Sequence, residues 1–163
     1  MIEIDTTEIK DFVEKLGNAP EAFKEEVSGF MESFGIHFLN YVQDEIIRRR
    51  VMDSRLLLAS FSKGNAENVW ELSDGGFKLE IGTNVKYAAW VNDGHRQTPG
   101  RFIPGYWQGN RFVYEPGASS GMVLKASWVE GKHYWEGAIN IMERVFPGLV
   151  EEKFKEWINN YFG

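Results

Sequence analysis

The sequence has no cysteine among its 163 residues, and it has only three histidines and five prolines. The absence of cysteine excludes a disulfide scaffold and every zinc or iron–sulfur site that is built on thiolates. A chain of this length buries roughly 70% of its unfolded surface, so it needs neither a metal nor a disulfide to fold. Its 43% of apolar residues can fill one core. We therefore expect a single domain, residues 1–163.

Long apolar runs are also missing. No stretch of the sequence approaches the roughly 20 apolar residues of a membrane helix. Residues 1–5 have neither the basic nor the apolar region of a signal peptide. We therefore expect a soluble, intracellular chain with no membrane partner. The formal net charge of −6 argues against general nucleic-acid binding, because that affinity comes from neutralising phosphates.

Charge of opposite sign is segregated along the chain, and aromatic residues are in excess. Residues 1–47 carry 11 acidic and 3 basic side chains, whereas residues 48–66 carry 1 acidic and 5 basic ones. Aromatic residues make up 15% of the chain and include six tryptophans. Because aromatic side chains are enriched at the centres of interfaces, this excess indicates a contact surface.

Residues 1–50 have the pattern of helices. A short helix is expected from Asp5, an N-cap residue, to Gly17, and a second one starts at Pro20. In the second helix the apolar residues form one stripe; they are Phe23, Val27, Phe30, Met31, Phe34, Phe38, Tyr41 and Val42. If unbroken to Arg50, this helix would be about 46 Å long, so it must bend, break or protrude. The cations Arg48, Arg49 and Arg50 suit its C-terminal end.

Residues 53–126 have the pattern of a sheet with a long loop. Residues 53–61 fit either a short helix or a buried strand. Period-two patterns in 68–72 and 77–81 flank the sequence Ser-Asp-Gly-Gly and predict a hairpin. Residues 93–121 combine many glycines and prolines with aromatics and predict a long aromatic loop. A second hairpin would pair residues 111–115 with 122–126.

Residues 132–162 have helical spacing again. Pro147 is expected to kink this region or to separate two helices. The order of elements therefore predicts an α+β fold, with a small antiparallel sheet built from hairpins and packed against a long N-terminal helix and C-terminal helices.

The sequence contains one string that resembles a catalytic motif, Gly-Ala-Ser-Ser-Gly at 117–121, with Ser119 in the place of a nucleophile. A nucleophile elbow needs a helix after the serine, but residues 122–126 have a strand pattern. His37, His95 and His133 are widely spaced and form no recognisable ligand pair. Glycine motifs that cradle phosphates are absent. We therefore expect no enzymatic activity, no metal and no cofactor.

The basic residues of the aromatic loop are the better candidates for function. The interface candidates there are Arg96, Arg101, Phe102, Tyr106, Trp107 and Arg111. Such a set could stack on bases, or it could pair with carboxylates of a neighbouring copy, and the acidic total favours the second. Arg48 and Arg49 are further candidates, although capping of the helix end is sufficient to explain them. A carbohydrate- or receptor-binding platform centred on Trp107 is the alternative.

Four short segments occur in a distinctive order along the chain. They are Asp53-Ser54 with Leu57 and Ser60-Phe61, Ile81-Gly82-Thr83-Asn84-Val85-Lys86-Tyr87-Ala88, Val91-Asn92-Asp93-Gly94-His95-Arg96, and Gly131-Lys132-His133-Tyr134-Trp135-Glu136-Gly137-Ala138. Their order resembles the tail-completion or head–tail joining proteins of long-tailed bacteriophages, the gene-product-ten-like tail components. The resemblance covers roughly residues 20–160.

This resemblance implies a non-enzymatic α+β subunit of the virion tail, assembled in the host cytoplasm. It implies a ring, expected to be a hexamer, at the head-proximal end of the tail tube. The implied partners are other copies of the chain, the major tail tube protein and the head connector or head-closure protein. Nucleic acid would be met only indirectly, if the lumen of the ring passes DNA.

Overall fold

The fold is seen in a computed structural model that describes residues 2–5, 21–51 and 55–162. The chain divides into two compact units. Unit 1 is formed by residues 1–88 and 133–163, and unit 2 by residues 89–132. The expected α+β class is confirmed, and the one domain expected from length is organised as these two units.

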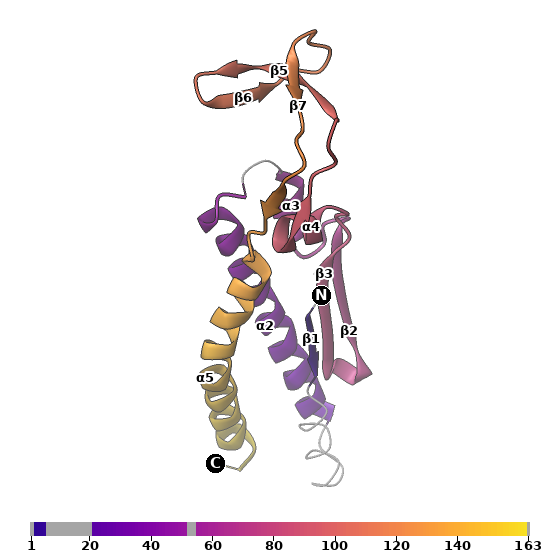
Figure 1. The fold of residues 1–163 in the computed structure, drawn as a ribbon. Helices are drawn as coiled ribbons and strands as arrows, with labels where there is room; N and C mark the ends of the chain where they lie inside the picture. Colours follow the sequence, from indigo (N-terminus) through magenta and orange to yellow (C-terminus); the bar gives the residue numbers. More distant parts are fainter. Residues whose placement is uncertain (1, 6–20, 52–54, 163) are drawn as a thin grey trace. The chain divides into compact units, whose positions relative to one another are not determined.

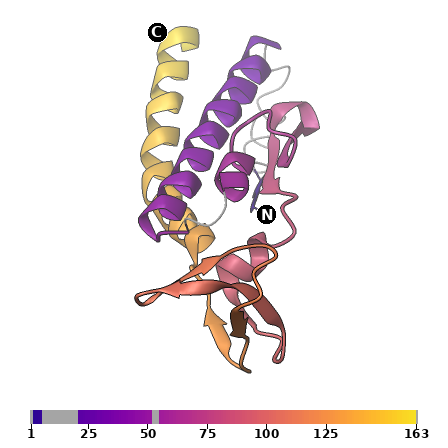
Figure 2. The ribbon, with the colours of Figure 1, turned by 90° about the horizontal axis from the view of Figure 1, so that it is seen from above.

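Unit 1 consists of helices and one antiparallel sheet (Figure 1). Its helices are α2 (Glu21–Arg48), α3 (Arg55–Ser60) and α5 (Tyr134–Phe162). Its strands are β1 (Ile2–Asp5), β2 (Asn68–Ser73) and β3 (Lys78–Thr83), in the order β1-β3-β2. Helices α2 and α5 run side by side, and α2 also contacts β3, so α2 lies between α5 and the sheet (Figures 1 and 2).

The core of unit 1 lies on both sides of α2. Buried α2 side chains of the predicted stripe include Met31, Phe34, Phe38 and Val42. Leu39 and Ile46, which are not part of that stripe, are buried as well. Toward α5 the packing is aromatic: the ring centroids of Phe34 and Phe146 are 5.0 Å apart, and those of Phe38 and Trp135 are 5.2 Å apart. Toward the sheet, Leu79 and Ile81 of β3 are fully buried.

Several expectations for unit 1 are confirmed. The long helix forms over 28 residues without a break, and the hairpin of β2 and β3 forms around the short 3-10 turn Asp74–Gly76. In that turn Gly75 and Gly76 have φ of 66° and 94°, a region that glycine enters at no steric cost. The ambiguous segment 53–61 contains helix α3, whose Ser60 carbonyl accepts a hydrogen bond from the Asn68 side chain at 2.9 Å.

One expectation for unit 1 is wrong, and one of two alternatives is excluded. Residues 2–5, expected within a helical region, form strand β1, because Ile2–Asp5 pairs along the free edge of β3. Pro147 does not separate two helices, since α5 is continuous across it over 29 residues, and a kink at Pro147 stays a prediction. The expected short helix after Asp5 falls on residues 6–20, which lie outside the described residues.

Unit 2 has its own small sheets. Helix α4 (Ala88–Asp93) leads into β4 (Gly94–Arg96), which pairs antiparallel with β8 (Trp128–Glu130). Between them, β5 (Phe102–Gln108), β6 (Arg111–Tyr114) and β7 (Gly121–Val123) form a three-stranded sheet in the order β6-β5-β7. The expectation of a long loop over 93–121 is therefore wrong.

The expected hairpin of residues 111–115 with 122–126 is also wrong, because β6 and β7 each pair with β5. Strands β5 and β6 are joined by the two-residue turn Gly109-Asn110, in which Gly109 has φ of 61°. Glycine at the first turn position is the requirement of a type II′ hairpin, whose twist suits paired strands. Residues Gly109 and Asn110 therefore close a hairpin rather than extend a loop.

Candidate interaction surface

Unit 2 exposes large apolar side chains and buries none. Every residue of 89–132 is described, and no apolar side chain among them is buried. The most exposed ones are Trp90 at 62%, Phe102 at 49%, Tyr106 at 47%, Trp107 at 59%, Tyr114 at 62%, Val123 at 58% and Trp128 at 56%. A sheet of short strands with no buried face has little to stabilise it by itself. Exposed apolar surface of this kind marks an interaction site.

The aromatic candidates of β5 lie on two faces of its sheet. Tyr106 is paired with Val113, and the next residue, Trp107, is paired with Phe112. Successive strand residues point to opposite faces, so Tyr106 and Trp107 cannot contact one flat partner together. The rings of Trp107 and Phe112 are 5.3 Å apart and nearly perpendicular, at 69°. Both faces of the sheet are therefore apolar.

Two glycines leave room for the rings of Phe112 and Phe102 beside the backbone of unit 2. A Cβ atom at Gly105 would meet the Val113 carbonyl and the Phe112 ring, and a Cβ atom at Gly121 would meet the Ile103 carbonyl and the Phe102 ring. Only glycine leaves room for such a cross-strand contact. The glycines that suggested a loop in the sequence thus serve the packing of exposed aromatic rings.

The arginine candidates of unit 2 do not form one group. Arg96 ends β4 and Arg101 precedes β5, and both line one hollow of unit 2 with Trp90 and His95. Arg111 begins β6 and does not line that hollow. All three side chains belong to exposed residues. Unit 2 as a whole carries 5 basic and 3 acidic residues, whereas the rest of the chain carries 13 and 21.

Arg48 and Arg49 lie in unit 1, and both bind Glu45. Arg48 donates from Nε and Nη2 to the two carboxylate oxygens at 2.6 and 2.7 Å, and Arg49 Nε donates to Oε2 at 2.7 Å. The Glu45 side chain is 5% exposed, that of Arg49 29% and that of Arg48 64%. The hydrogen bond from Arg48, with the charges of both arginines, holds the pKa of Glu45 at about 2 although burial opposes this. Their intrachain role is thus explained.

The residues considered for catalysis do not form a site. Ser119 is exposed between β6 and β7, and the element that follows it is a strand, as the sequence predicted. Among residues 2–5, 21–51 and 55–162, no three His, Asp or Glu side chains are placed to hold a metal ion. Within the same ranges no helix is long and apolar enough to cross a membrane.

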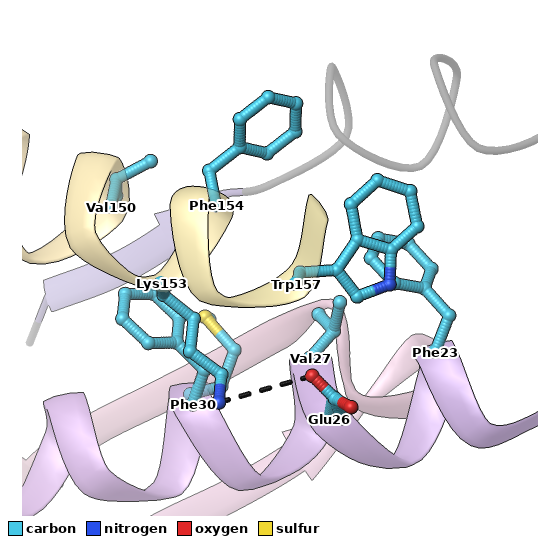
Figure 3. A pocket seen from close by; sticks show the side chains of 9 residues that line it. Phe23, Glu26, Val27, Phe30, Val150, Lys153, Phe154 and Trp157 are labelled. Atoms are coloured by element: carbon cyan, nitrogen blue, oxygen red, sulfur yellow. Dashed lines mark ion pairs between the residues drawn. The ribbon is translucent and has the colours of Figure 1, made fainter. Parts of the chain in front are cut away.

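A hollow between α2 and α5 was missed by the sequence analysis (Figure 3). Its lining includes Phe23, Val27 and Phe30 of α2 with Phe154 and Trp157 of α5, and the Phe23 and Trp157 ring centroids are 4.6 Å apart. At its rim Lys153 Nζ lies 3.8 Å from a carboxylate oxygen of Glu26. The volume is only about 70 Å³, far below the several hundred Å³ of a small-molecule site. This hollow is a gap between aromatic side chains.

Comparison with known proteins defines the class of protein to which this chain belongs. It belongs to a family that includes a protein of a bacterial phage-like element. No family model matches the chain, and no solved structure matches it.

Two members of this family come from Bacillus subtilis (strain 168). The chain is 40% identical over 142 residues to the phage-like element PBSX protein XkdI, and the matched region covers 86% of this chain and 88% of XkdI. It is 39% identical over 162 residues to the uncharacterized protein YqbI, and the matched region covers 94% of this chain and 97% of YqbI. The phage relationship expected from the sequence is confirmed, and the tail-completion family stays a prediction.

Proposed function

We propose that this chain is a structural, non-enzymatic subunit of a phage or phage-like tail, which completes the tail and joins it to the head. One observation carries the proposal: a unit of 44 residues, 89–132, buries no apolar side chain and exposes aromatic ones on both faces of its sheet. The relative XkdI is a protein of a phage-like element, and this supports a role of the present chain in a phage or phage-like particle.

Assembly is the step that would cover this surface. A Trp or Tyr side chain that goes from full exposure to full burial covers about 150–250 Å². Tyr106 and Trp107 are 47% and 59% exposed, so about half of that area remains to be buried. At about 25 cal/mol per Å², each ring contributes about 2–3 kcal/mol before the costs of association. Phe102, Tyr106 and Trp107 of β5 are therefore proposed to insert against neighbouring subunits. Because Tyr106 and Trp107 face opposite ways, two different neighbours or two segments of one neighbour would contact them.

The proposed partners are further copies of the chain in a ring, expected to be a hexamer, together with the tail tube protein and the head connector or head-closure protein. A ring needs two different complementary patches on each subunit. Acidic residues 1–47 and the basic, aromatic unit 2 are the proposed patches. The proposed location is the virion tail, assembled in the host cytoplasm, with DNA only in the lumen.

A carbohydrate platform centred on Trp107 stays the alternative prediction. Trp107 is 59% exposed and its ring meets that of Phe112 at 69°, which suits a sugar and a protein partner alike. No observation on the described residues favours a sugar, so we do not propose it as a second function.

Electron microscopy of lysates tests the proposed role. The gene would be deleted from the phage or prophage that encodes it, and the lysate compared with that of a strain complemented by the intact gene. The account predicts separate heads and tails. It also predicts tails of irregular length, because nothing completes their head-proximal end. Normal joined particles without the protein would contradict it.

A further inference from the structure

Unit 2 contains a hollow that has no assigned role. It has a volume of about 470 Å³ and lies beside α4, β4 and the start of β5. Its lining side chains are Trp90, His95, Arg96, Gln97, Thr98, Arg101 and Leu124. All of them belong to unit 2, so the hollow is complete within one compact part of the chain. Its size is within the range of small-molecule and side-chain recognition sites.

The polar groups of this hollow suit an anion. Arg96 and Arg101 are exposed, and within the described ranges neither forms an ion pair. The imidazole of His95 lies against Trp90, with ring centroids 5.9 Å apart, and its Nδ1 is buried with no hydrogen-bond partner among the described residues. A buried polar atom without a partner points to a group that the isolated chain does not supply. Guanidinium groups bind carboxylates and phosphates through paired hydrogen bonds.

We infer that this hollow receives a carboxylate side chain from the acidic unit 1 of a second copy of the chain. The inference rests on the proposed function, because it assumes that copies associate. Arg96 and Arg101 donate to the carboxylate, and the exposed ring of Trp90 covers the aliphatic part of the incoming side chain. The contact joins unlike surfaces of two copies, which is the geometry that a ring requires.

The charge of the chain favours a second copy over duplex DNA, which also carries anionic groups, as the occupant of the hollow. Unit 2 carries a net excess of two basic residues, and the rest of the chain carries an excess of eight acidic ones. A second copy therefore brings a strongly acidic surface to a basic one, which favours encounter and fixes its direction. The total charge of −6 opposes the binding of a DNA duplex to this chain.

The test is a double charge reversal with a matched control. Sedimentation velocity would compare the wild-type chain, R96E/R101E and K125E/K132E over a range of protein and salt concentrations. Lys125 and Lys132 are exposed residues of unit 2 that do not line the hollow, so K125E/K132E controls for the same change of charge. We expect the association constant to fall at least about tenfold in R96E/R101E and less than about threefold in K125E/K132E. Salt should weaken the wild-type contact in the same way.

Mixing gives a second readout. A chain with R96E/R101E keeps its acidic unit 1, so it should still bind the intact hollow of a wild-type chain and end the assembly there. We expect added R96E/R101E to shorten wild-type assemblies. The inference would be overturned if R96E/R101E associated with itself as strongly as the wild-type chain does. It would also be overturned if the wild-type chain stayed monomeric at every concentration. Loss of binding to a 30-base-pair duplex with unchanged self-association would assign the hollow to DNA instead.

The two proposals fail separately. If removal of the sheet β6-β5-β7 abolishes association but R96E/R101E does not, the proposed function stands and the role of this hollow is wrong. If association survives removal of that sheet, the proposed use of the aromatic residues is wrong.

Discussion

At the scale of single residues, the junction of α2 and α5 depends on a buried carboxylate and on the lack of a side chain opposite it. Glu45 is neutralised by Arg48 and Arg49 one turn further along α2. A Cβ atom at Gly137 of α5 would overlap the Glu45 carboxylate and crowd the Arg49 guanidinium. Glycine usually weakens a helix interior, so its presence at 137 is explained by this close approach.

We predict that Gly137→Ala destabilises unit 1 by about 1–3 kcal/mol, because overpacking forces buried groups apart. Gly148 of the same helix is the matched control, since a Cβ atom there meets nothing within 4 Å. Gly148→Ala should stabilise the helix by about 0.5–1 kcal/mol. Urea unfolding followed by far-UV circular dichroism measures both free energies. Equal effects of the two substitutions would show that Gly137 is not crowded.

Glu45→Gln should remove a stabilisation that depends on pH. The pKa of Glu45 is lowered from 4.5 to about 2 in the folded chain, so its contribution is complete above pH 4.5 and is lost as the pH falls toward 2. We expect Glu45→Gln to cost about 1–3 kcal/mol at pH 7. The difference from wild type, measured by denaturant unfolding, should shrink between pH 4.5 and 2. A difference that is constant over this range would contradict the buried ion pair.

At the scale of elements, local pattern predicts most of unit 1 and little of unit 2. The apolar stripe of α2 and the glycines at 75 and 76 are local signals, and the helix and the hairpin follow them. Strand β5 contains Pro104 and Gly105, which in sequence indicate a break. The strand forms because β6 and β7 pair along it, and pairing between distant segments leaves no local pattern.

The same reasoning applies to the candidate residues. In the sequence, Arg96, Arg101 and Arg111 form one group of candidates because they are close in the chain. Pairing of β4 with β8 brings residues 94–96 to residues 128–130 and sets the place of His95. Arg101 precedes β5 and Arg111 lies opposite Gln108 at the other end of β5, so Arg111 does not line the hollow that Arg96 and Arg101 line with Trp90. Arg49 is half-hidden for a similar reason, since its partner Glu45 lies against α5.

Helix α5 offers a prediction at this scale. Pro147 lies inside the helix, where it has no N–H to donate to the carbonyl of residue 143. We predict that Pro147→Ala stabilises the helix by about 1–3 kcal/mol, measured as a rise in the midpoint of thermal unfolding. A fall in the midpoint would mean that the helix must bend at Pro147 to place Phe146 against the ring of Phe34.

At the scale of the whole molecule, the chain combines a unit with a packed core and a unit without one. Unit 1 has buried aromatic and aliphatic side chains from all three of its helices. Unit 2 buries no apolar side chain, although all of its residues are described. Unit 1 is acidic and unit 2 is basic. The proposed association with copies of the chain would cover the exposed aromatic side chains of unit 2 and pair its positive charge with an acidic unit 1.

Sedimentation velocity of a shortened chain tests this account most directly. Residues 98–126 would be replaced by a short Gly-Ser turn, since the Gln97 N–H already donates to the Ser127 carbonyl at 2.9 Å and the two ends lie together. The α2–α5 core and the pairing of β4 with β8 are left in place. The account predicts a folded monomer at concentrations where the intact chain assembles. Assemblies of unchanged mass, formed without the sheet β6-β5-β7, would contradict it.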